Sequence, residues 1–248
     1  TAEAADKNFP DAEIFTVVGD LVDNGEADYQ WRAWYIAAEK LLAEKIFAPV
    51  MGNHECYGVD WFNALPTAYL NQFNKGYFYS FDYGAAHFFI LNTQFAELDK
   101  FYPKLQGEQE YFFRRDNANT NRRWKIVLMH KDIYDYAQDK FNDIADKFLE
   151  LFDELEIDLV LTGHLHTYRN RGKIFNRKKS ARGTTYILCG RAGDQKYVEP
   201  HSDIDDVTYK NLRGEPESFI ALNISAAEIN LTAYTVDGEI LDKERILK

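Results

Sequence analysis

IFTVVGDLVDNGEADYQWRAWYIAAEKLLAEKIFAPV, residues 14–50, decides the fold of this chain. The stretch opens on a short apolar run rich in β-branched residues (14–18) and continues with aromatic and aliphatic residues at helical spacing among charges (29–45). It ends on a second apolar run (46–50). These patterns predict a strand, a helix and a strand in that order. Because this alternation is typical of parallel pairing, we expect helices outside a parallel sheet.

The same pattern recurs further along the chain and then changes. Apolar runs at 87–91, 125–129 and 159–162 and a helical pattern at 141–155 predict more strands and a further helix. A second, mostly antiparallel sheet is predicted from strand patterns at 173–176, 184–188, 219–224, 229–236 and 239–246, with a hairpin turn at Asp237-Gly238. Two sheets face to face with helices outside predict an α/β fold, a four-layer α-β-β-α sandwich of two mixed sheets, in a single domain over residues 1–248.

Composition limits the class of protein. The chain has 248 residues, of which 46% are hydrophobic and 15% aromatic, which is ample for one buried core. The net charge of -11 repels phosphate backbones, so no nucleic-acid partner is expected. No run of about 18 or more apolar residues occurs, so no membrane span is expected. Cys56 and Cys189 are too few to form a disulfide framework.

Residues of the types that bind metals directly follow four of the predicted strands. The four clusters are GDLVD (19–23), GNHE (52–55), MHK (129–131) and GHLH (163–166). Because ligand sites form at the carboxyl ends of parallel strands, we expect all four clusters to converge. Glycine opens three of them and lets the backbone turn sharply out of the strand. Asp, Asn and His without thiolate suit Mn, Fe or Zn in a hydrolytic site better than a structural zinc.

Taken singly, each cluster also has an ordinary interpretation. A histidine after a strand is more often a hydrogen-bonded structural residue, and Gly-Asp or Gly-Asn is more often a turn. Taken together, the four clusters resemble the calcineurin-like metallophosphoesterase family, whose motifs GDxxD, GNH(D/E), a strand-end His and GHxH follow in that order. The stretches Tyr79–Tyr83 and His87–Asn92 resemble the secreted, purple-acid-phosphatase-like bacterial branch. The resemblance covers the whole chain and implies the metallophosphoesterase fold and export to the cell envelope or beyond.

The resemblance implies metal roles for five residues and catalytic roles for two. It implies that Asp20 bridges two transition-metal ions (Mn, Fe or Zn), that Asn53, His130 and His164 complete the second site, and that His166 reaches the first. Such a pair of ions lowers the pKa of water and polarises a phosphate ester, so the predicted activity is hydrolysis of small phosphate monoesters or diesters.

The two predicted catalytic residues lie next to a predicted metal ligand. His54 follows Asn53 directly and is the predicted general acid. Glu55 is predicted to orient His54 and to raise its pKa, and the alternative for Glu55 is an exposed loop carboxylate. Asp23 stands where the purple acid phosphatases carry a metal-binding tyrosine, so no purple Fe(III) site is expected. Asp23 is instead expected to hydrogen-bond within its loop or to accept from a ligand histidine.

A run of basic residues starts just beyond His166 and has two interpretations. The run contains Arg169, Arg171, Lys173, Arg177, Lys178, Lys179 and Arg182. It either favours anionic substrates or forms the solvated face of a hairpin.

One family motif has no match in this sequence. The family begins with Asp-x-His or Asp-x-Gln at the end of a strand ahead of GDxxD, and none of the acidic residues before Asp20 follows an apolar run. The first metal site then keeps only Asp20 and His166, the sheet lacks its first strand, and hydrolysis by this chain is expected to be impaired. Three explanations stay open: the sequence starts late, the chain was cleaved from an N-terminal segment that is its natural partner, or the protein binds one metal. The rival hypothesis is a catalytically inactive binding or scaffolding module.

Overall fold

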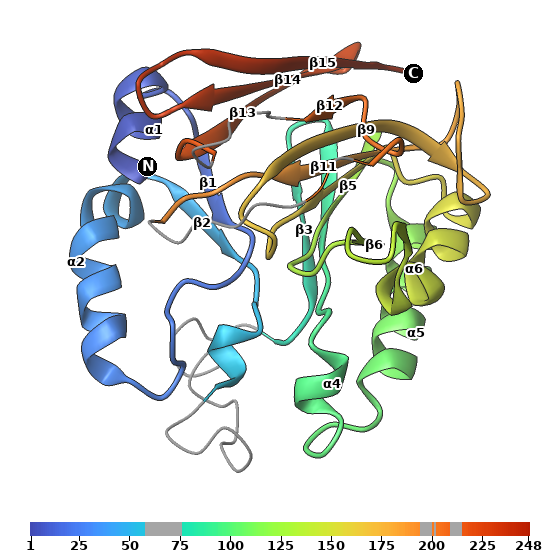
Figure 1. Ribbon diagram of the computed structural model, residues 1–248, viewed down its shortest axis with the longest axis horizontal. Coiled ribbons are helices and arrows are strands. Elements are labelled where there is room, and N and C mark those ends of the chain that lie inside the picture. Colours follow the sequence, from blue (N-terminus) through green and yellow to red (C-terminus); the bar gives the residue numbers. More distant parts are fainter. Residues whose placement is uncertain (58–75, 194–199, 201, 209–214) are drawn as a thin grey trace.

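The structure, a computed structural model, describes residues 1–57, 76–193, 200, 202–208 and 215–248. Its largest element is a mixed sheet of eight strands (Figure 1). The strands are β3 (Tyr79–Tyr83), β4 (Ala86–Ile90), β5 (Trp124–Leu128), β8 (Leu159–Thr162), β9 (Tyr168–Phe175), β10 (Lys178–Lys179), β11 (Thr184–Cys189) and β12 (Val207–Thr208). Their order is β10-β9-β11-β8-β5-β4-β3, and β12 pairs with β9.

The centre of this sheet is parallel. Strands β4, β5, β8 and β11 pair in parallel with one another, whereas β3 and β9 are antiparallel to their neighbours. All residues of β4 and β8 are buried, as expected for parallel strands that are covered on both faces. The carboxyl ends of β5 and β8 therefore lie next to each other at one edge of the sheet, and the loops that follow them start side by side.

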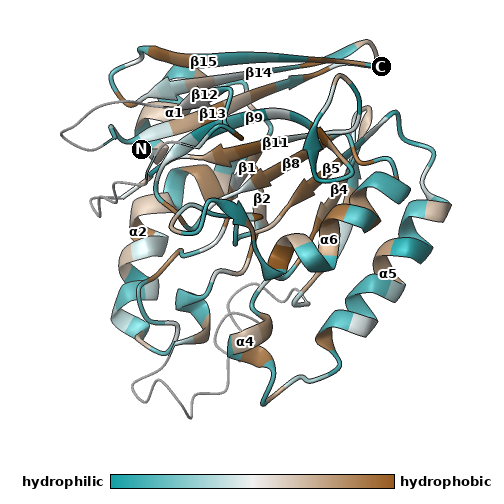
Figure 2. Cartoon of the chain, turned by 45° about the vertical axis from the view of Figure 1, so that its right-hand side comes forward, coloured by the Kyte–Doolittle hydropathy of each residue, from teal (hydrophilic) through white to brown (hydrophobic). Residues whose placement is uncertain are grey.

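Two helices cover one face of the main sheet. Helices α5 (Leu105–Asn119) and α6 (Asp143–Glu154) lie along this face (Figure 1), and their apolar side chains pack on Phe89 and Val127. The side chain of Asn142 caps α6 by accepting from the backbone N–H groups of its first turn. Figure 2 shows the alternation of hydrophobic and hydrophilic residues along α6 that one-sided burial requires.

The opposite face packs against a second, antiparallel sheet. This sheet contains β13 (Ser218–Ile224), β14 (Glu228–Thr235) and β15 (Ile240–Leu247). Alternate residues of β14 are buried and contribute Ile229, Leu231 and Ala233 to the core between the sheets. The predicted turn between β14 and β15 is present, and Gly238 has φ 88°, a value that glycine adopts without strain.

The remaining elements surround the first two clusters of the sequence. Strands β1 (Ile14–Val17) and β2 (Ile46–Pro49) form a separate two-stranded parallel sheet, and the helices nearby are α1 (Ala2–Asn8) and α2 (Asp28–Glu44). Short elements complete the chain: η1 (His54–Cys56), α4 (Phe95–Leu98), β6 (Tyr134–Asp135) and β7 (Lys140–Phe141). No helix in the described part of the chain has both the length and the apolar character that a membrane crossing needs.

The predicted α/β fold with two sheets and outer helices is confirmed, with two corrections to the sheets. Strands β9 and β11 were expected in the second sheet but belong to the first, because β11 pairs in parallel with β8. Strands β1 and β2 were expected in the main sheet but pair only with each other among the described residues. Both corrections concern strand partners, which apolar runs do not specify.

Candidate metal centre

Three side chains from distant parts of the sequence meet at the carboxyl edge of the sheets. Asp20 follows β1, His130 follows β5 and His164 follows β8, and their ligand atoms all lie within 4.8 Å of one another. The imidazole rings of His130 and His164 are 5.1 Å apart between centroids and inclined by 72°. The structure thus brings together one residue from each of three predicted clusters.

Asn53 joins this group through His130. Nε2 of His130 lies 2.9 Å from Oδ1 of Asn53 and 3.0 Å from Oδ2 of Asp20. Nδ1 of the same ring lies 2.7 Å from the backbone oxygen of Val18, which fixes Nδ1 as a donor and directs Nε2 toward the two oxygens. One nitrogen and two oxygen acceptors that face one another need a proton or a cation between them. The donor set therefore fits a transition-metal ion.

Electrostatics keep two of these groups in their metal-binding forms. Burial opposes ionisation of Asp20, but the charge of His130 and its hydrogen bond lower the pKa of Asp20 to about 2. Burial, and then the charge of His130, lower the pKa of His164 to about 4. Both groups are deprotonated at neutral pH. Burial disfavours a charge on His130, yet the charge of Asp20 and its hydrogen bond raise the pKa of His130 above its usual value.

Close approach of the backbone explains the glycines in the clusters. A Cβ atom at Gly19, where φ is 93°, would lie 2.3 Å from Nδ1 of His130. A Cβ at Gly52 would lie 2.2 Å from Oδ1 of Asp20. Asp20, His164 and His166 themselves adopt left-handed φ values of 56°, 74° and 46°. Such conformations cost about 1–3 kcal/mol each and cluster at functional sites.

We expect Gly52→Ala to weaken binding of Mn²⁺ by about tenfold or more, because the new methyl group displaces the carboxylate of Asp20. The measurement is titration calorimetry with Mn²⁺. Gly107→Ala is the matched control, since a Cβ at Gly107 in α5 meets no atom within 4 Å. Equal affinities in the two variants would show that the close contact at Gly52 does not control the site.

His54 lies beside the group and is held by Asp23. Its Nδ1 atom is 2.8 Å from the backbone oxygen of Asp23 and 3.2 Å from Oδ1 of the same residue. Its backbone N–H donates to Oδ1 of Asp20, and its ring contacts the ring of Tyr57 edge-on. The side chain is 27% exposed. With Nδ1 engaged by Asp23, Nε2 is left to act on a ligand.

Glu55 connects the GDLVD cluster (19–23) to the GNHE cluster (52–55) through hydrogen bonds. Its carboxylate is 1% exposed and accepts hydrogen bonds from four backbone N–H groups. The donors are Asp20 (2.9 Å), Leu21 (2.6 Å), Val22 (3.2 Å) and Gly52 (2.5 Å). Burial and the nearby charge of Asp20 raise the pKa of Glu55 to about 7, whereas the amide donors favour its ionised form.

These contacts correct two expectations about Glu55. The alternative that it is an exposed loop carboxylate is wrong, because it is among the most buried charged residues. Glu55 was expected to orient His54, but the ring of His54 contacts Asp23 instead. Both the backbone oxygen and the carboxylate of Asp23 lie within reach of Nδ1 of His54. The four N–H donors converge on Glu55 instead, because a charged acceptor satisfies buried donors strongly.

His166 and the basic run complete the account of the predicted residues. His166 is half-buried and its charge contributes to the lowered pKa of His164, but it is not a member of the three-residue group, so its metal role stays a prediction.

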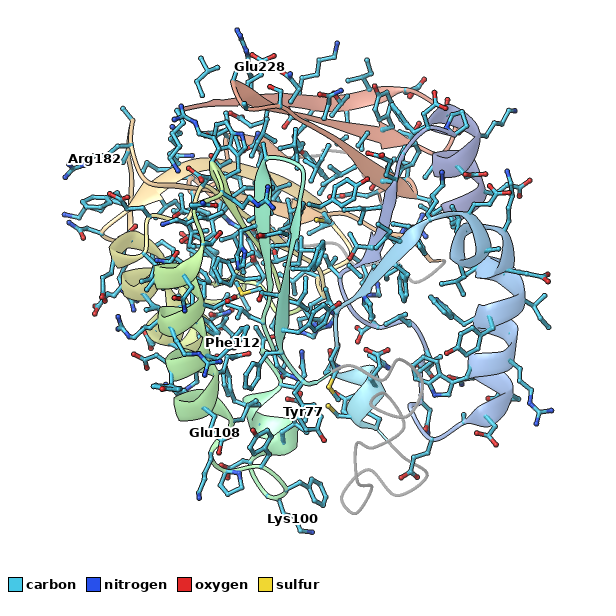
Figure 3. All side chains as sticks on the ribbon, turned by 180° about the vertical axis from the view of Figure 1, so that it is seen from behind. Tyr77, Lys100, Glu108, Phe112, Arg182 and Glu228 are labelled. Carbon is cyan, nitrogen blue, oxygen red and sulfur yellow. The ribbon has the colours of Figure 1, made fainter. Side chains whose placement is uncertain are left out.

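Arg169 and Arg171 are buried in ion pairs rather than solvated. Arg182, at the end of the run, is exposed (Figure 3), and its guanidinium lies 4.2 Å from the centroid of the Phe175 ring.

Comparison with known proteins places these observations in a family. The family model described as calcineurin-like phosphoesterase matches residues 2–168, which is more than half of the chain and contains the four clusters up to His166. The chain belongs to the calcineurin-like phosphoesterase family. The membership expected from the four motifs is therefore confirmed.

Curated proteins with names also resemble this chain of the calcineurin-like phosphoesterase family. Purple acid phosphatase 23 of Arabidopsis thaliana is 26% identical over 209 residues, which are 77% of this chain and 42% of that protein. The phosphoenolpyruvate phosphatase of Allium cepa is 28% identical over 196 residues, 67% of this chain and 39% of that protein. The chain spans less than half the length of these relatives.

Solved structures agree with the calcineurin-like phosphoesterase fold. A purple acid phosphatase from yellow lupin (Lupinus luteus) seeds superposes with a TM-score of 0.75 at 20% identity, covering 99% of this chain and 48% of that one. GAP50, the anchor in the inner membrane complex of Plasmodium, superposes with a TM-score of 0.73 at 15% identity, covering 99% of this chain and 82% of that one. At these identities the likeness concerns the fold.

Proposed function

We propose that this chain is the catalytic part of a metal-dependent phosphatase that hydrolyses small phosphate monoesters or diesters. The observation that carries the proposal is the convergence of Asp20, Asn53, His130 and His164 at the carboxyl edge of the sheets. Membership of a phosphoesterase family whose relatives carry phosphatase names supports the same reaction.

In this proposal, the metal ion activates the substrate and water, and the side chains hold the ion. When bound, a transition metal polarises the phosphoryl oxygen and lowers the pKa of water until hydroxide forms near neutral pH. Asp20, Asn53, His130 and His164 bind the ion, and the hydrogen bond from Nδ1 of His130 to Val18 holds that ring in place. We extend the proposal to an additional ion, at the site called the first above, which Asp20 and His166 would hold.

His54 is the proposed proton donor to the leaving group. Its Nδ1 atom is engaged by the backbone oxygen and the carboxylate of Asp23, so the proton at Nε2 is the one available to a leaving oxygen. The carboxylate of Asp23, 3.2 Å from Nδ1 of His54, orients the ring for this step. Asp23 and His54 therefore act as an acid pair in the proposed mechanism.

Metal analysis together with two ester substrates tests the proposal. The chain is incubated with Mn, Fe and Zn, its metal content is measured, and hydrolysis of p-nitrophenyl phosphate and of bis(p-nitrophenyl) phosphate is followed. We expect bound metal and turnover that a chelator abolishes and that added metal restores. The absence of both metal and turnover would refute the proposal. The number of metal equivalents in the active chain decides between one ion and two.

A binding or scaffolding role is the second candidate. The observation that favours it is that, among the described residues, the one group of His, Cys, Asp or Glu side chains placed to hold a metal ion has three members, Asp20, His130 and His164. This candidate predicts a folded chain that binds one equivalent of metal or none and hydrolyses neither ester. The same experiment therefore separates the two functions.

A further inference from the structure

One buried carboxylate connects the segments that carry the two histidine ligands. Asp132 follows His130 by two residues and is 2% exposed. Its Oδ1 atom accepts from Oγ1 of Thr162 (3.0 Å) and from Nη1 of Arg171 (3.0 Å), and its Oδ2 atom accepts from Nη2 of Arg171 (2.6 Å). Thr162 ends β8 just before His164, and Arg171 lies in β9 just after His166. Asp132 thus contacts both ends of the loop that carries these histidines.

The arginine partner is itself held firmly. Arg171 is 0% exposed, and its Nη2 atom also donates to the hydroxyl oxygen of Tyr136 at 2.6 Å. The hydroxyl of Tyr136 in turn donates to Oδ1 of Asp205 at 2.9 Å, and the guanidinium of Arg171 lies 5.6 Å from the centroid of the Tyr136 ring. A two-point contact between a guanidinium and a carboxylate fixes distance and orientation together. Asp132 is consequently anchored on β9.

Backbone hydrogen bonds also hold the histidine loop. The N–H of Gly163 donates to the oxygen of His130 at 2.8 Å, and the N–H of Met129 donates to the oxygen of Leu161 at 3.1 Å. Within the loop, the N–H of Leu165, between the left-handed residues His164 and His166, donates to the oxygen of Gly163 at 2.9 Å, and the N–H of Gly190 donates to the oxygen of Thr167 at 3.1 Å. The side chain of Asp132 adds contacts at both ends of the loop, to Thr162 and to Arg171.

We propose that Asp132 is a positioning residue that sets the distance between His130 and His164 and thereby the affinity of the centre for a metal ion. This inference rests on the proposed metal-dependent function. The competing explanation is an ordinary buried ion pair that stabilises the fold and leaves metal affinity unchanged. The two explanations differ in one measurable quantity, the affinity of the folded chain for metal.

Thr162→Val tests the proposal with a small change in shape. It removes the hydroxyl that joins β8 to Asp132, together with the longer contact of that hydroxyl with the backbone oxygen of Ile187 (3.5 Å), and leaves the pair of Asp132 and Arg171 in place. Thr185→Val is the matched control, because Thr185 is equally buried on the neighbouring strand and its Oγ1 atom has no hydrogen-bond partner among the described residues. Thr162→Ser restores the hydroxyl. Affinity for Mn²⁺ is measured by titration calorimetry, and unfolding of each metal-free chain is measured by circular dichroism.

The proposal predicts a specific pattern of affinities. We expect Thr162→Val to weaken Mn²⁺ binding by about tenfold, which is the lower end of the loss in affinity seen when a residue that orients metal ligands is replaced. We expect the affinities of Thr185→Val and Thr162→Ser to stay within about twofold of wild type. Equal affinities of Thr162→Val and Thr185→Val would overturn the proposal, as would weak binding by Thr162→Ser. If the valine chain does not fold, Thr162→Ala replaces it with the same expectation. If the wild-type chain binds none of Mn, Fe and Zn, the proposed function fails together with the inference, whereas wild-type binding without the Thr162 effect refutes the inference alone.

Discussion

Asp20→Asn is expected to weaken Mn²⁺ binding by more than about a hundredfold and to remove turnover of both ester substrates. Even contacts that only orient metal ligands are worth about 10–100-fold in affinity, and Asp20 is itself the charged ligand of the group. Asparagine keeps the shape and the acceptor for the N–H of His54 but loses the charge that faces Nε2 of His130. Titration calorimetry and p-nitrophenol release measure the two effects.

Asp23→Asn supplies the control for this prediction. It makes the same chemical change in the same loop, but the side chain of Asp23 is 71% exposed and contacts His54 rather than the ligand group. We expect Asp23→Asn to bind Mn²⁺ within about twofold of wild type. The assignment of Asp20 as the central ligand would be wrong if both variants lost the same affinity or if Asp20→Asn bound like wild type.

Glu55→Gln is expected to lower the free energy of unfolding of the metal-free chain by about 3 kcal/mol or more. Four backbone N–H groups donate to the carboxylate of Glu55, and each buried donor left without an acceptor costs about 1–3 kcal/mol. A glutamine keeps one oxygen and directs an NH₂ group at the remaining donors. Urea unfolding followed by circular dichroism gives the free energy.

Glu39→Gln is the matched control, since Glu39 is exposed on α2 and its replacement is expected to change the unfolding free energy by no more than about 0.5 kcal/mol. The result also decides between two roles for Glu55. Unchanged stability combined with slow turnover would favour the catalytic role expected from the sequence. A large loss of stability supports the role as the acceptor that joins the loops of Asp20 and Gly52.

Most strands were predictable from the sequence, because each has its own apolar run. The runs at 14–18, 46–50 and 159–162 became β1, β2 and β8 within one residue of the expected bounds. Helix α5 was missed because its sequence, LQGEQEYFFRRDNAN, is mostly polar and buries only Leu105, Gln109 and Phe113. Its amphipathic pattern is therefore too weak to predict a helix.

The residues at the candidate site were predictable by type, but their contacts were not. Asp20, His130 and His164 stood out because metal-binding residues follow strands. Asp132 was missed because its partner Arg171 is 39 residues away, in a basic run that was interpreted either as favouring anionic substrates or as a solvated hairpin face. A carboxylate near a strand end has no local signal that distinguishes a buried ion pair from an exposed loop residue. Partners far apart in sequence emerge only when the strand order is known.

The hydrogen bond between Nδ1 of His130 and Val18 has a consequence for the order of events during folding. It joins residues 112 positions apart, and the contact of Asn53 with His130 joins residues 77 positions apart. Contacts of such long range form only after large loops have closed, which places them late on the folding pathway. The residues of the candidate centre are thus scattered in the unfolded chain, and an ion that bound them only after assembly would prolong the lifetime of the native state without speeding its formation.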